Sequence, residues 1–404
     1  MSTSTTSPSP SARRGARSCA CCRCRTSWTR FEIVSKPARR HGYTTGACAA
    51  AAAQGAARML VTQRRVETVA VALPAGFSAT FALHGQRFDA VFAACYVIKD
   101  AGDDPDVTHG CEVWAEVKAN PPQPPFVKGG SSSVEIVGGV GIGRVTKPGL
   151  AVAVGAWAIN PVPRRMITEA LQEVFSRHPS PVSCHCTISI PDGEERAKRT
   201  LNARLGIVGG LSILGTSGVV KPISTRAWTD TIDTAVDVAL ACGSSTIVLS
   251  TGRTSEVVAQ RYFASAEGLP EEAFVMMGDH VGYALRVCAA KGVAQVVLAG
   301  QFAKLLKIAC GHEQTHVAAS ELDLQILGGW LQHDPRTARL APLVAGANTA
   351  RHLLELAAAD RALLELVAGK VKAFAAGVVP GLAVQVLLAG YDGQVLYFSG
   401  SGRG

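Results

Sequence analysis

The sequence predicts an α+β N-terminal domain, a two-layer sandwich, joined to an α/β doubly wound, Rossmann-like domain. Two observations predict this class. Between residues 66 and 119, apolar and polar residues alternate over short segments, as in strands that cover one face of a sheet. From about residue 229, short apolar strands alternate with helical segments across short loops, which favours a parallel sheet built with right-handed crossovers.

The first domain is expected at residues 39–223 and should begin with a helix. Thr44, Thr45 and Gly46 are suited to its cap, and the alanine-rich run that follows has high helix propensity. The pattern then predicts strands over 66–74, 77–83, 88–100, 107–119 and 182–193, with a helix over 163–177.

The Rossmann-like domain is expected at residues 224–345. Helices are predicted over 229–242, 254–263, 279–292 and 301–310, and strands over 245–250, 273–278 and 294–300. Doubly wound sheets bind ligands at the carboxyl ends of their strands, near the point where the strand order reverses. Those ends read Ser250-Thr251-Gly252, Gly278-Asp279 and Gly300-Gln301.

The last segment, 346–404, should form two helices and a β-hairpin around Asp392-Gly393, packing back on the body. The apolar stretch 373–390 contains Pro380 and Gln385. It is therefore predicted to be a helix end followed by a strand, and we expect no membrane span.

The positive charge of the chain is concentrated at its N-terminus. Residues 1–40 hold nine Lys and Arg against one acid, Glu32, while the rest is close to neutral. We expect residues 1–38 to be a disordered basic tail, because they are rich in Ser, Thr, Pro and Arg. A nearly neutral body offers no broad surface for phosphates, so nucleic acid is not an expected partner.

The cysteines favour a reducing compartment, the cytoplasm, because most of them stand singly in apolar contexts. A cluster in the tail, Cys19, Cys21, Cys22 and Cys24, lacks a second pair at zinc-finger distance. In the Cys-His-Cys stretch 184–186, strand alternation sends the histidine to the opposite face. We expect no protein metal site.

An acidic stretch at 97–110 is the strongest candidate for catalysis. It contains Asp100, Asp103, Asp104 and Asp106, with Lys99 before them and His109 after. A turn between two strands needs fewer aspartates. Repulsion should raise the pKa of at least one, which would suit proton transfer. Alternatively, the aspartates neutralise Lys99 or a positively charged ligand.

Loop cations in the first half are candidates for binding a polyanionic small ligand. They are Arg144, Lys147, Arg164, Arg165, Arg204 and Lys221. For any single one, a solvated surface charge is the simpler interpretation. The glycine loop 138–143 either lets the backbone approach a ligand or is a structural turn, since no helix follows it as a dinucleotide fingerprint requires.

Two helix starts could hold a carboxylate or phosphate on bare backbone N–H groups. One is at Thr44, Thr45 and Gly46; the other follows the strand end at Thr251 and Gly252. Ordinary capping would also explain each.

Several long stretches closely resemble the cobalt-precorrin-5B C(1)-methyltransferase family of anaerobic cobalamin synthesis, in order from about residue 40 to the C-terminus. They are HGYTTGACAAAAAQGAA, VIKDAGDDPDVTHG, GRVTKPGL, AINPVPRRMI, AKRTLNARLGIVGGLSILGTSGVVKP and THVAASELDLQIL. The chain departs from the family pattern at Val140, Ile142, Gln301 and Phe302, which puts roles at those positions in doubt.

The resemblance implies S-adenosylmethionine-dependent methylation of carbon 1 of cobalt-precorrin-5B to cobalt-precorrin-6A. The cobalt then arrives within the corrinoid substrate, whose rim carboxylates suit the loop cations. It implies a cofactor site at the two helix starts, with Asp279 holding the ribose. Asp100, Asp103, Asp104 and His109 become candidates to accept a proton, and a homo-oligomer is conceivable.

Two other classes compete with a methyltransferase. A non-catalytic tetrapyrrole-binding or carrier protein would keep the cation loops and need no adenosyl site. A phosphate-handling enzyme could use the aspartates for magnesium, but the chain has no P-loop.

Overall fold

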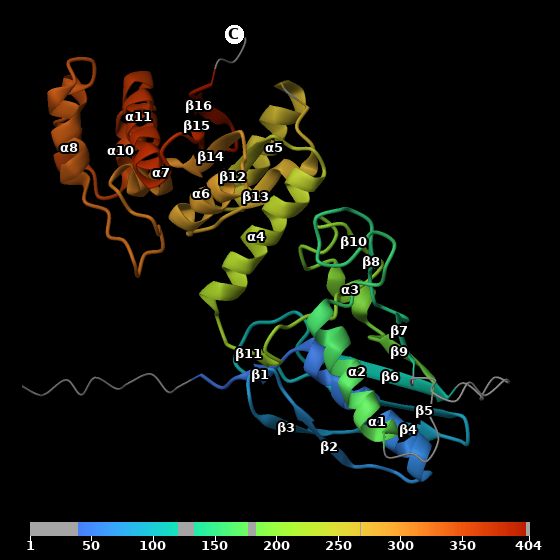
Figure 1. Cartoon of the computed structure of the whole chain (residues 1–404). Helices are drawn as coiled ribbons and strands as arrows, with labels where there is room; N and C mark the ends of the chain where they lie inside the picture. Colours follow the sequence, from blue (N-terminus) through green and yellow to red (C-terminus); the bar gives the residue numbers. More distant parts are fainter. Residues whose placement is uncertain (1–38, 120–132, 177–182, 267, 401–404) are drawn as a thin grey trace, which may run out of the picture. The chain divides into compact units, whose positions relative to one another are not determined.

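The protein is a mixed α/β protein in the computed structural model, which describes residues 39–119, 133–176, 183–266 and 268–400 (Figure 1). The basic tail and its cysteine cluster lie outside the described residues. Two five-stranded sheets, each with its own hydrophobic cluster, organise the chain. No helix among the described residues is both long and apolar enough to cross a membrane.

The first sheet has the strand order β4-β5-β6-β9-β7 and is antiparallel except for the β7–β9 pair. Its strands are β4 (His84–Phe88), β5 (Phe92–Ile98), β6 (Glu112–Ala119), β9 (Cys184–Ser189) and β7 (Val134–Gly138). A separate hairpin pairs β2 (Thr68–Ala72) with β3 (Ser78–Ala82).

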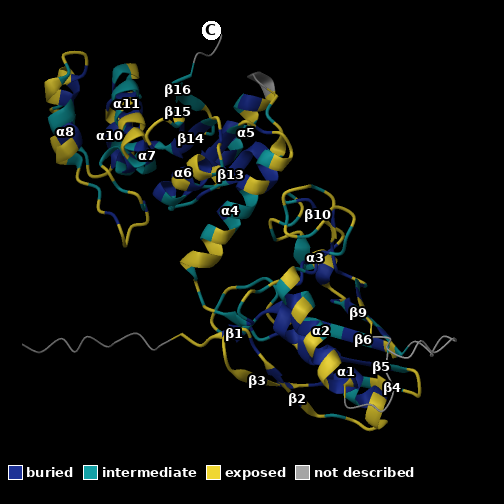
Figure 2. Cartoon of the chain, in the orientation of Figure 1, coloured by how far each residue is buried: buried dark blue, intermediate teal, exposed yellow. Residues whose placement is uncertain are grey.

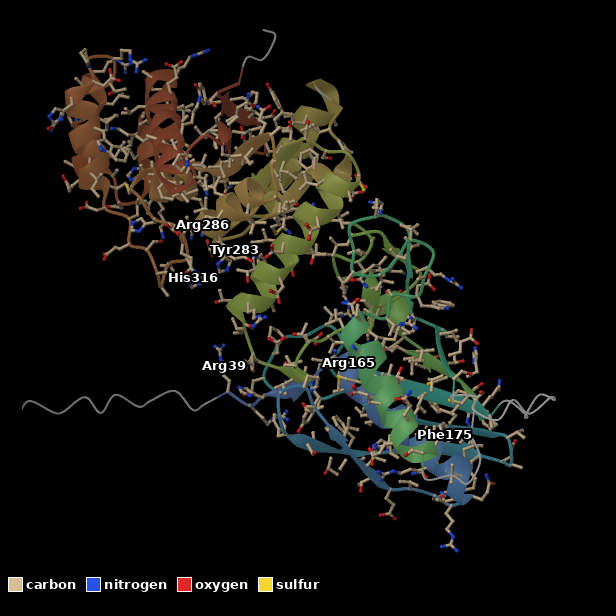
Figure 3. The ribbon with its side chains drawn as sticks, viewed as in Figure 1. Arg39, Arg165, Phe175, Tyr283, Arg286 and His316 are labelled. Carbon is tan, nitrogen blue, oxygen red and sulfur yellow. The ribbon has the colours of Figure 1, made fainter. Side chains whose placement is uncertain are left out.

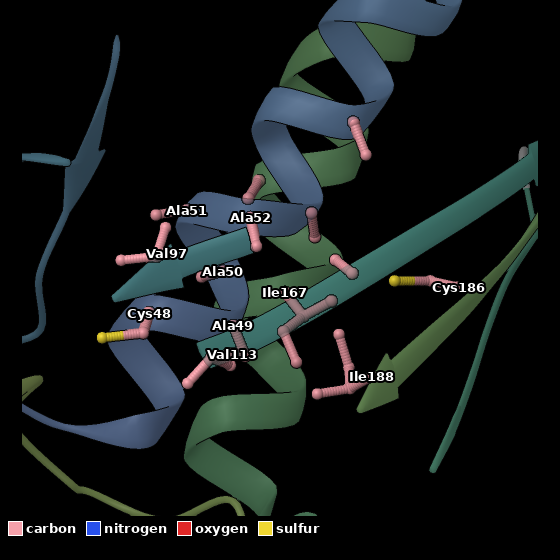
Figure 4. Close-up of a cluster of buried hydrophobic side chains, with 14 of the residues drawn as sticks. Cys48, Ala49, Ala50, Ala51, Ala52, Val97, Val113, Ile167, Cys186 and Ile188 are labelled. Atoms are coloured by element: carbon pink, nitrogen blue, oxygen red, sulfur yellow. The ribbon is translucent and has the colours of Figure 1, made fainter. Parts of the chain in front are cut away.

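Helices α1 (Thr45–Thr62) and α2 (Pro161–Phe175) form the layer against this sheet. Figure 4 shows Ala49 to Ala52 of α1 beside Val113 and Ile188 of the sheet and Ile167 of α2. The alanines of α1 are fully buried, and the helix is dark along most of its length in Figure 2. Small side chains let α1 pack closely against both the sheet and α2.

The strand predicted over 88–100 is shorter in the structure. Asp89 accepts hydrogen bonds from the N–H groups of Val91 and Phe92, both at 2.9 Å, and turns the chain between β4 and β5. Strand β6 likewise begins only at Glu112, because residues 107–110 complete the acidic turn. That turn joins β5 to β6, as predicted. The Cys-His-Cys alternation is also confirmed: Cys184 and Cys186 are buried and His185 is not.

The glycine loop packs protein backbone against protein backbone. A Cβ added at Gly141 would lie 1.9 Å from the carbonyl oxygen of Ile190, and one at Gly193 or Gly210 would lie 2.2 Å from the carbonyl oxygen of Gly141. The structural-turn interpretation therefore fits this loop. Small elements surround it: β8 (Arg144–Val145), which pairs with β10 (Ile207–Val208), and helix α3 (Gly193–Ala197). Strand β1 (Gly42–Tyr43) pairs with β11 (Val219–Val220).

The second sheet has the order β13-β12-β14-β15-β16, parallel except for β16. Its strands are β12 (Thr246–Ser250), β13 (Phe274–Met276), β14 (Gln295–Gln301), β15 (Ala383–Ala389) and β16 (Val395–Phe398). The chain passes from β12 to β13 on one side and then crosses to β14 on the other. The strand order therefore reverses between β12 and β14.

Helices cover both faces of this sheet. Helix α5 (Arg253–Ala266) packs with alternate strand residues such as Val248 and Ala299. The residues between them, such as Leu249, face α4 (Thr225–Ala241), α6 (Val281–Ala290), α7 (Phe302–Ala309) and α11 (Arg361–Val378). Phe302, where the chain departs from the family pattern, is fully buried in the hydrophobic cluster that the sheet forms with these helices.

The remaining elements are α8 (Leu324–His333), α9 (Leu343–Gly346), α10 (Ala350–Leu356) and the short 3-10 helices at Glu271–Ala273 and Ala338–Leu340. Helix α11 ends at Val378 and β15 begins at Ala383, so the helix-then-strand prediction for 373–390 is confirmed. The predicted hairpin around Asp392-Gly393 is β15–β16, and it completes the second sheet.

Candidate functional site

Each aspartate of the acidic turn has a partner, and Asp100 and Asp103 share Arg40. Arg40 donates to both carboxylate oxygens of Asp100, with Nη2 2.9 Å from Oδ1, and the backbone N–H of Arg40 lies 2.6 Å from Oδ2 of Asp103. The N–H of Ile223 donates to Oδ1 of Asp104 at 2.8 Å. Ile223 has a φ of 52°, which is strained for a β-branched residue, so Asp104 holds an unfavourable backbone conformation in place.

Asp106 neutralises a buried lysine. Only 1% of Lys99 is exposed, and its Nζ lies 2.5 Å from Oδ2 of Asp106. Thr108 donates to the other oxygen through its N–H and its hydroxyl. A buried ammonium group without a counter-ion would be costly, so this pair explains one of the four aspartates structurally.

The resolved pKa shifts run opposite to the expected repulsion. Hydrogen bonding to Arg40 is the main reason that the pKa of Asp100 is about 2. Burial alone would raise the pKa of Asp106, but the charge of Lys99 and hydrogen bonds from Lys99 and Thr108 hold it below its ordinary value. Both groups are ionised near neutral pH and are poor proton acceptors.

His109 is also engaged. Its Nδ1 accepts a hydrogen bond from the N–H of Ala101 at 3.1 Å. A neutral ring must then carry its proton on Nε2, so it presents a donor outward and would have to break this bond to accept a proton. The bond favours a structural role for His109.

The predicted loop cations fall into two groups. Lys147 pairs with Glu272 at 2.6 Å, and Arg204 pairs at 2.8 Å with Glu256, which is fully buried and also binds Arg253. These pairs tie the segments around residues 147 and 204 to α5 and the Glu271–Ala273 turn. Charges that are already neutralised in this way are less available to a ligand.

The other four cations are more open to a ligand. Arg144 lies over the ring of Trp157, and Arg164 donates to the carbonyl oxygen of Ile136 at 3.1 Å. Arg165 lies on α2, and its side chain is 61% exposed (Figure 3). Its Nε lies 3.8 Å from Oε1 of Glu169, which is a loose ion pair. Lys221 is exposed and has no ion-pair partner among the described residues.

The helix start at Thr44, Thr45 and Gly46 is closed by the protein itself. The N–H groups of Thr44 and Gly46 donate to the carbonyl oxygens of Gly218 and Leu214, and Oγ1 of Thr44 caps Ala47 at 3.2 Å. Thr45 is buried and its hydroxyl accepts from the N–H of Leu214. Capping by the 212–218 segment therefore accounts for this motif.

The start of α5 is open. Among the described residues, the backbone N–H groups of Gly252, Arg253, Thr254 and Ser255 have no acceptor, whereas the N–H of Thr251 donates to the carbonyl oxygen of Ala299 at 3.0 Å. A Cβ on Gly252 would meet nothing within 4 Å. This helix start lies at the end of β12, where the strand order reverses, and has the donors that an anion needs.

A buried hydroxyl supports this location. Ser250, the last residue of β12, is fully buried and its Oγ has no hydrogen-bond partner. Strand alternation puts Ser250 on the same face as Val248, which α5 covers. An unsatisfied buried polar group is rare and calls for an explanation, and this one lies in the residue that ends β12, just before the open helix start.

Asp279 follows the neighbouring strand, β13. Its Oδ1 accepts from Thr315 at 2.6 Å and from Lys304, while Oδ2 has no partner among the described residues. Burial alone would raise the pKa of Asp279, but Lys304 and Thr315 lower it, so the carboxylate is ionised. One oxygen is anchored and the other can accept hydrogen bonds. Since adjacent strands are about 4.8 Å apart, Asp279 and the α5 start lie at the same sheet edge.

No group of three or more His, Cys, Asp or Glu side chains in the described part of the chain could hold a metal ion.

Two family models match the chain: CbiD over residues 33–222 and the CbiD C-terminal domain over residues 314–400. A cobalt-precorrin-5B C(1)-methyltransferase of Geotalea daltonii is 60% identical over 359 residues, which cover 89% of this chain and 98% of that protein. The chain belongs to the CbiD family.

Other proteins of the CbiD family are also similar to this chain. The cobalt-precorrin-5B C(1)-methyltransferase of Geobacter sulfurreducens is 61% identical over 89% of this chain and 98% of its own length. That of Priestia megaterium is 42% identical over 80% of this chain and 86% of its own length. A crystal structure of the cobalamin biosynthesis protein CbiD from Archaeoglobus fulgidus is 29% identical, covers 67% of this chain and 79% of that chain, and has a TM-score of 0.35.

Three residues of this CbiD chain were missed by sequence reasoning. The charge of Arg40 was counted with the basic N-terminus, and its contact with Asp100, sixty residues away, gave no local signal. Ser250 was predicted only as part of a ligand-binding strand end, and Trp228 gave no local signal, because a tryptophan in a helix is ordinary. Only the fold shows that Ser250 is unpaired and that Trp228 lies against Gly278.

The Asp100 pair predicts acid sensitivity. A carboxyl group whose folded pKa lies below its unfolded value of 3.8 stabilises the fold above that value, and the contribution is lost as the pH falls toward about 2. In Asp100→Asn, the free energy of unfolding should therefore decline less between about pH 5 and pH 2 than in the wild type. Urea unfolding across this range measures it. Glu169→Gln, at a loose exposed pair, should keep the wild-type slope, and equal slopes for Asp100→Asn and the wild type would contradict the prediction.

Proposed function

We propose that this chain transfers the methyl group of S-adenosylmethionine to carbon 1 of cobalt-precorrin-5B, giving cobalt-precorrin-6A. Membership of the CbiD family supports the reaction, since its curated relatives carry that name. The open start of α5 supports the co-substrate, because it offers an anion site where the strand order reverses. A carrier protein would have no need of such a site.

We place the co-substrate along the carboxyl edge of β12 and β13. The carboxylate of its methionine part accepts hydrogen bonds from the N–H groups of residues 252–255, and Oδ2 of Asp279 accepts from the ribose hydroxyls. The helix dipole favours the negative charge of the carboxylate at the α5 start. The anchored, ionised carboxylate of Asp279 is a suitable acceptor for the ribose hydroxyls. The other candidate helix start, at Thr44, Thr45 and Gly46, is assigned to capping. The site at Thr251 and Gly252 is kept for the co-substrate.

The two sheets correspond to two domains in this proposal. Residues 39–223 form the α+β sandwich, and residues from 224 form the Rossmann-like domain. Residues 346–404, which the sequence set apart, are counted with the second domain because β15 and β16 belong to its sheet. The described cysteines are free thiols, which supports a cytoplasmic location.

The corrinoid's carboxylates are assigned to the loop cations that remain available. Arg165 and Lys221 lead this group because they are exposed and weakly paired or unpaired, and Arg144 and Arg164 follow. Lys147 and Arg204 rank last because acidic residues already neutralise them. Cobalt enters as part of the substrate.

The transfer forms a carbon–methyl bond as the sulfur–methyl bond breaks, and sulfur keeps the electron pair. The protein's contribution is to hold the two reactants in line. A proton that the macrocycle loses needs an acceptor. Asp103 is the best placed of the predicted candidates, since it is exposed and its Oδ1 has no partner among the described residues, whereas Asp100 and His109 are bound more fully.

The reaction itself is tested with purified protein and cobalt-precorrin-5B under anaerobic conditions. Methyl-labelled S-adenosylmethionine should yield a corrinoid that carries one labelled methyl group, located on carbon 1 by NMR. S-adenosylhomocysteine should appear in equal amount. If the protein binds the corrinoid tightly but no label is transferred, the carrier interpretation replaces the enzyme.

A matched pair of variants tests the anion site. Proline is tolerated at the first position of a helix, so Arg253→Pro removes one N–H donor there, while Arg253→Ala removes only the side chain. Arg253→Pro should bind S-adenosylhomocysteine about tenfold more weakly than Arg253→Ala, as expected for one hydrogen bond to a charged group. Calorimetry measures this. 5′-Methylthioadenosine, which lacks the carboxylate, should bind both variants equally, and equal affinities for S-adenosylhomocysteine would refute the site.

The proton acceptor is tested by Asp103→Asn and Asp104→Asn. If Asp103 accepts the proton, Asp103→Asn should lower kcat by about a hundredfold, in the range for a general base, with little change in KM for the corrinoid. Asp104→Asn should act mainly on stability through Ile223. Unchanged kcat in both variants would return the whole turn to a structural role.

A further inference from the structure

We propose that Trp228 is a stacking platform for the adenine ring of the co-substrate. This inference rests on the proposed function and adds a binding residue that neither the motifs nor the relatives' names assign. It starts from an unusual placement: Trp228 is 45% exposed and belongs to none of the hydrophobic clusters of the described residues. Exposure of one side chain is ordinary, so the inference depends on how the indole is held and on what lies beside it.

The indole is fixed rather than mobile. Its Nε1–H donates to the carbonyl oxygen of Met277 at 3.1 Å, which sets the ring's orientation from the first turn of α4. The ring also lies against Gly278: a Cβ there would be 2.9 Å from Cζ2 of Trp228. Glycine at this position, with a φ of 59°, therefore lets the ring lie directly on the end of β13.

The position suits a nucleoside. Gly278 is followed by Asp279, the proposed ribose acceptor, so the platform and this carboxylate stand side by side at the end of β13. The α5 start lies at the end of the adjoining strand, β12. A flat ring joined to a ribose and then to a carboxylate would meet Trp228, Asp279 and the bare N–H groups in that order. A pre-oriented indole binds such a ring without losing side-chain freedom.

Calorimetry with S-adenosylhomocysteine and with adenosine tests the platform. Trp228→Ala should weaken the binding of both ligands about tenfold, the usual scale for losing one base–aromatic stack, whereas Trp228→Phe should keep most of the affinity. Phe77→Ala is the matched control, because Phe77 is a 50% exposed aromatic of the β2–β3 turn, and its affinity should equal that of the wild type.

Fluorescence gives a second readout that does not depend on the alanine variant folding. S-adenosylhomocysteine should quench tryptophan emission in the wild type, and in Trp228→Phe this quenching should be lost while binding persists. Quenching that survives in Trp228→Phe, or wild-type affinity in Trp228→Ala, would overturn the platform and leave the proposed function intact. An increase only in the KM for the corrinoid would likewise overturn it and assign Trp228 to the macrocycle. A wild-type protein that binds no S-adenosylhomocysteine would overturn both proposals.

Discussion

Backbone N–H groups at the start of a helix need acceptors, and the two candidate helix starts of this chain meet that need in opposite ways. At α1, carbonyl oxygens of the 212–218 segment and the Thr44 hydroxyl take the donors, and the site is closed. At α5, four donors have no acceptor among the described residues, and the unpaired hydroxyl of Ser250 lies at the preceding strand end. Because these donors and the positive end of the helix dipole are open to a ligand, α5 is where a negatively charged group would gain most. The positions of the ribose acceptor and the aromatic platform follow from this starting point.

The acidic turn shows how a conspicuous motif can be mainly structural. Its aspartates bind the entering chain at Arg40, the segment before α4 at Ile223, and the buried ammonium group of Lys99. Each contact joins segments that are separated in sequence or buries a charge that needs a partner. The partners of Asp100 and Asp106 lower the pKa of both carboxyl groups, which is the opposite of what a proton acceptor with a raised pKa requires. The turn thus fixes the joint between the first sheet and α4, and exposed Asp103 keeps one oxygen, Oδ1, without a partner among the described residues.

Periodicity predicted much of the fold, because alternation and helix propensity are local properties. The strands around Val113 and Val248, the alanine helix and the final hairpin all follow from neighbouring residues. Site residues depended on distant contacts. Arg204 and Lys147 looked like free cations until Glu256 and Glu272 were seen beside them, and Ser250 looked ordinary until the sheet left it unpaired. The turn at Asp89, which shortens the strand predicted over 88–100, was missed, because it depends on a side chain bonding to backbone that alternation does not detect.

The central claim is that the α5 start, at the reversal of strand order, holds the carboxylate of the methyl donor. A crystal structure of the full chain with S-adenosylhomocysteine tests this most directly. The account predicts the carboxylate within hydrogen-bond distance of the N–H groups of residues 252–255, with the ribose at Asp279. A ligand bound at the α1 start, or any pose in which only water meets the α5 donors, would contradict it.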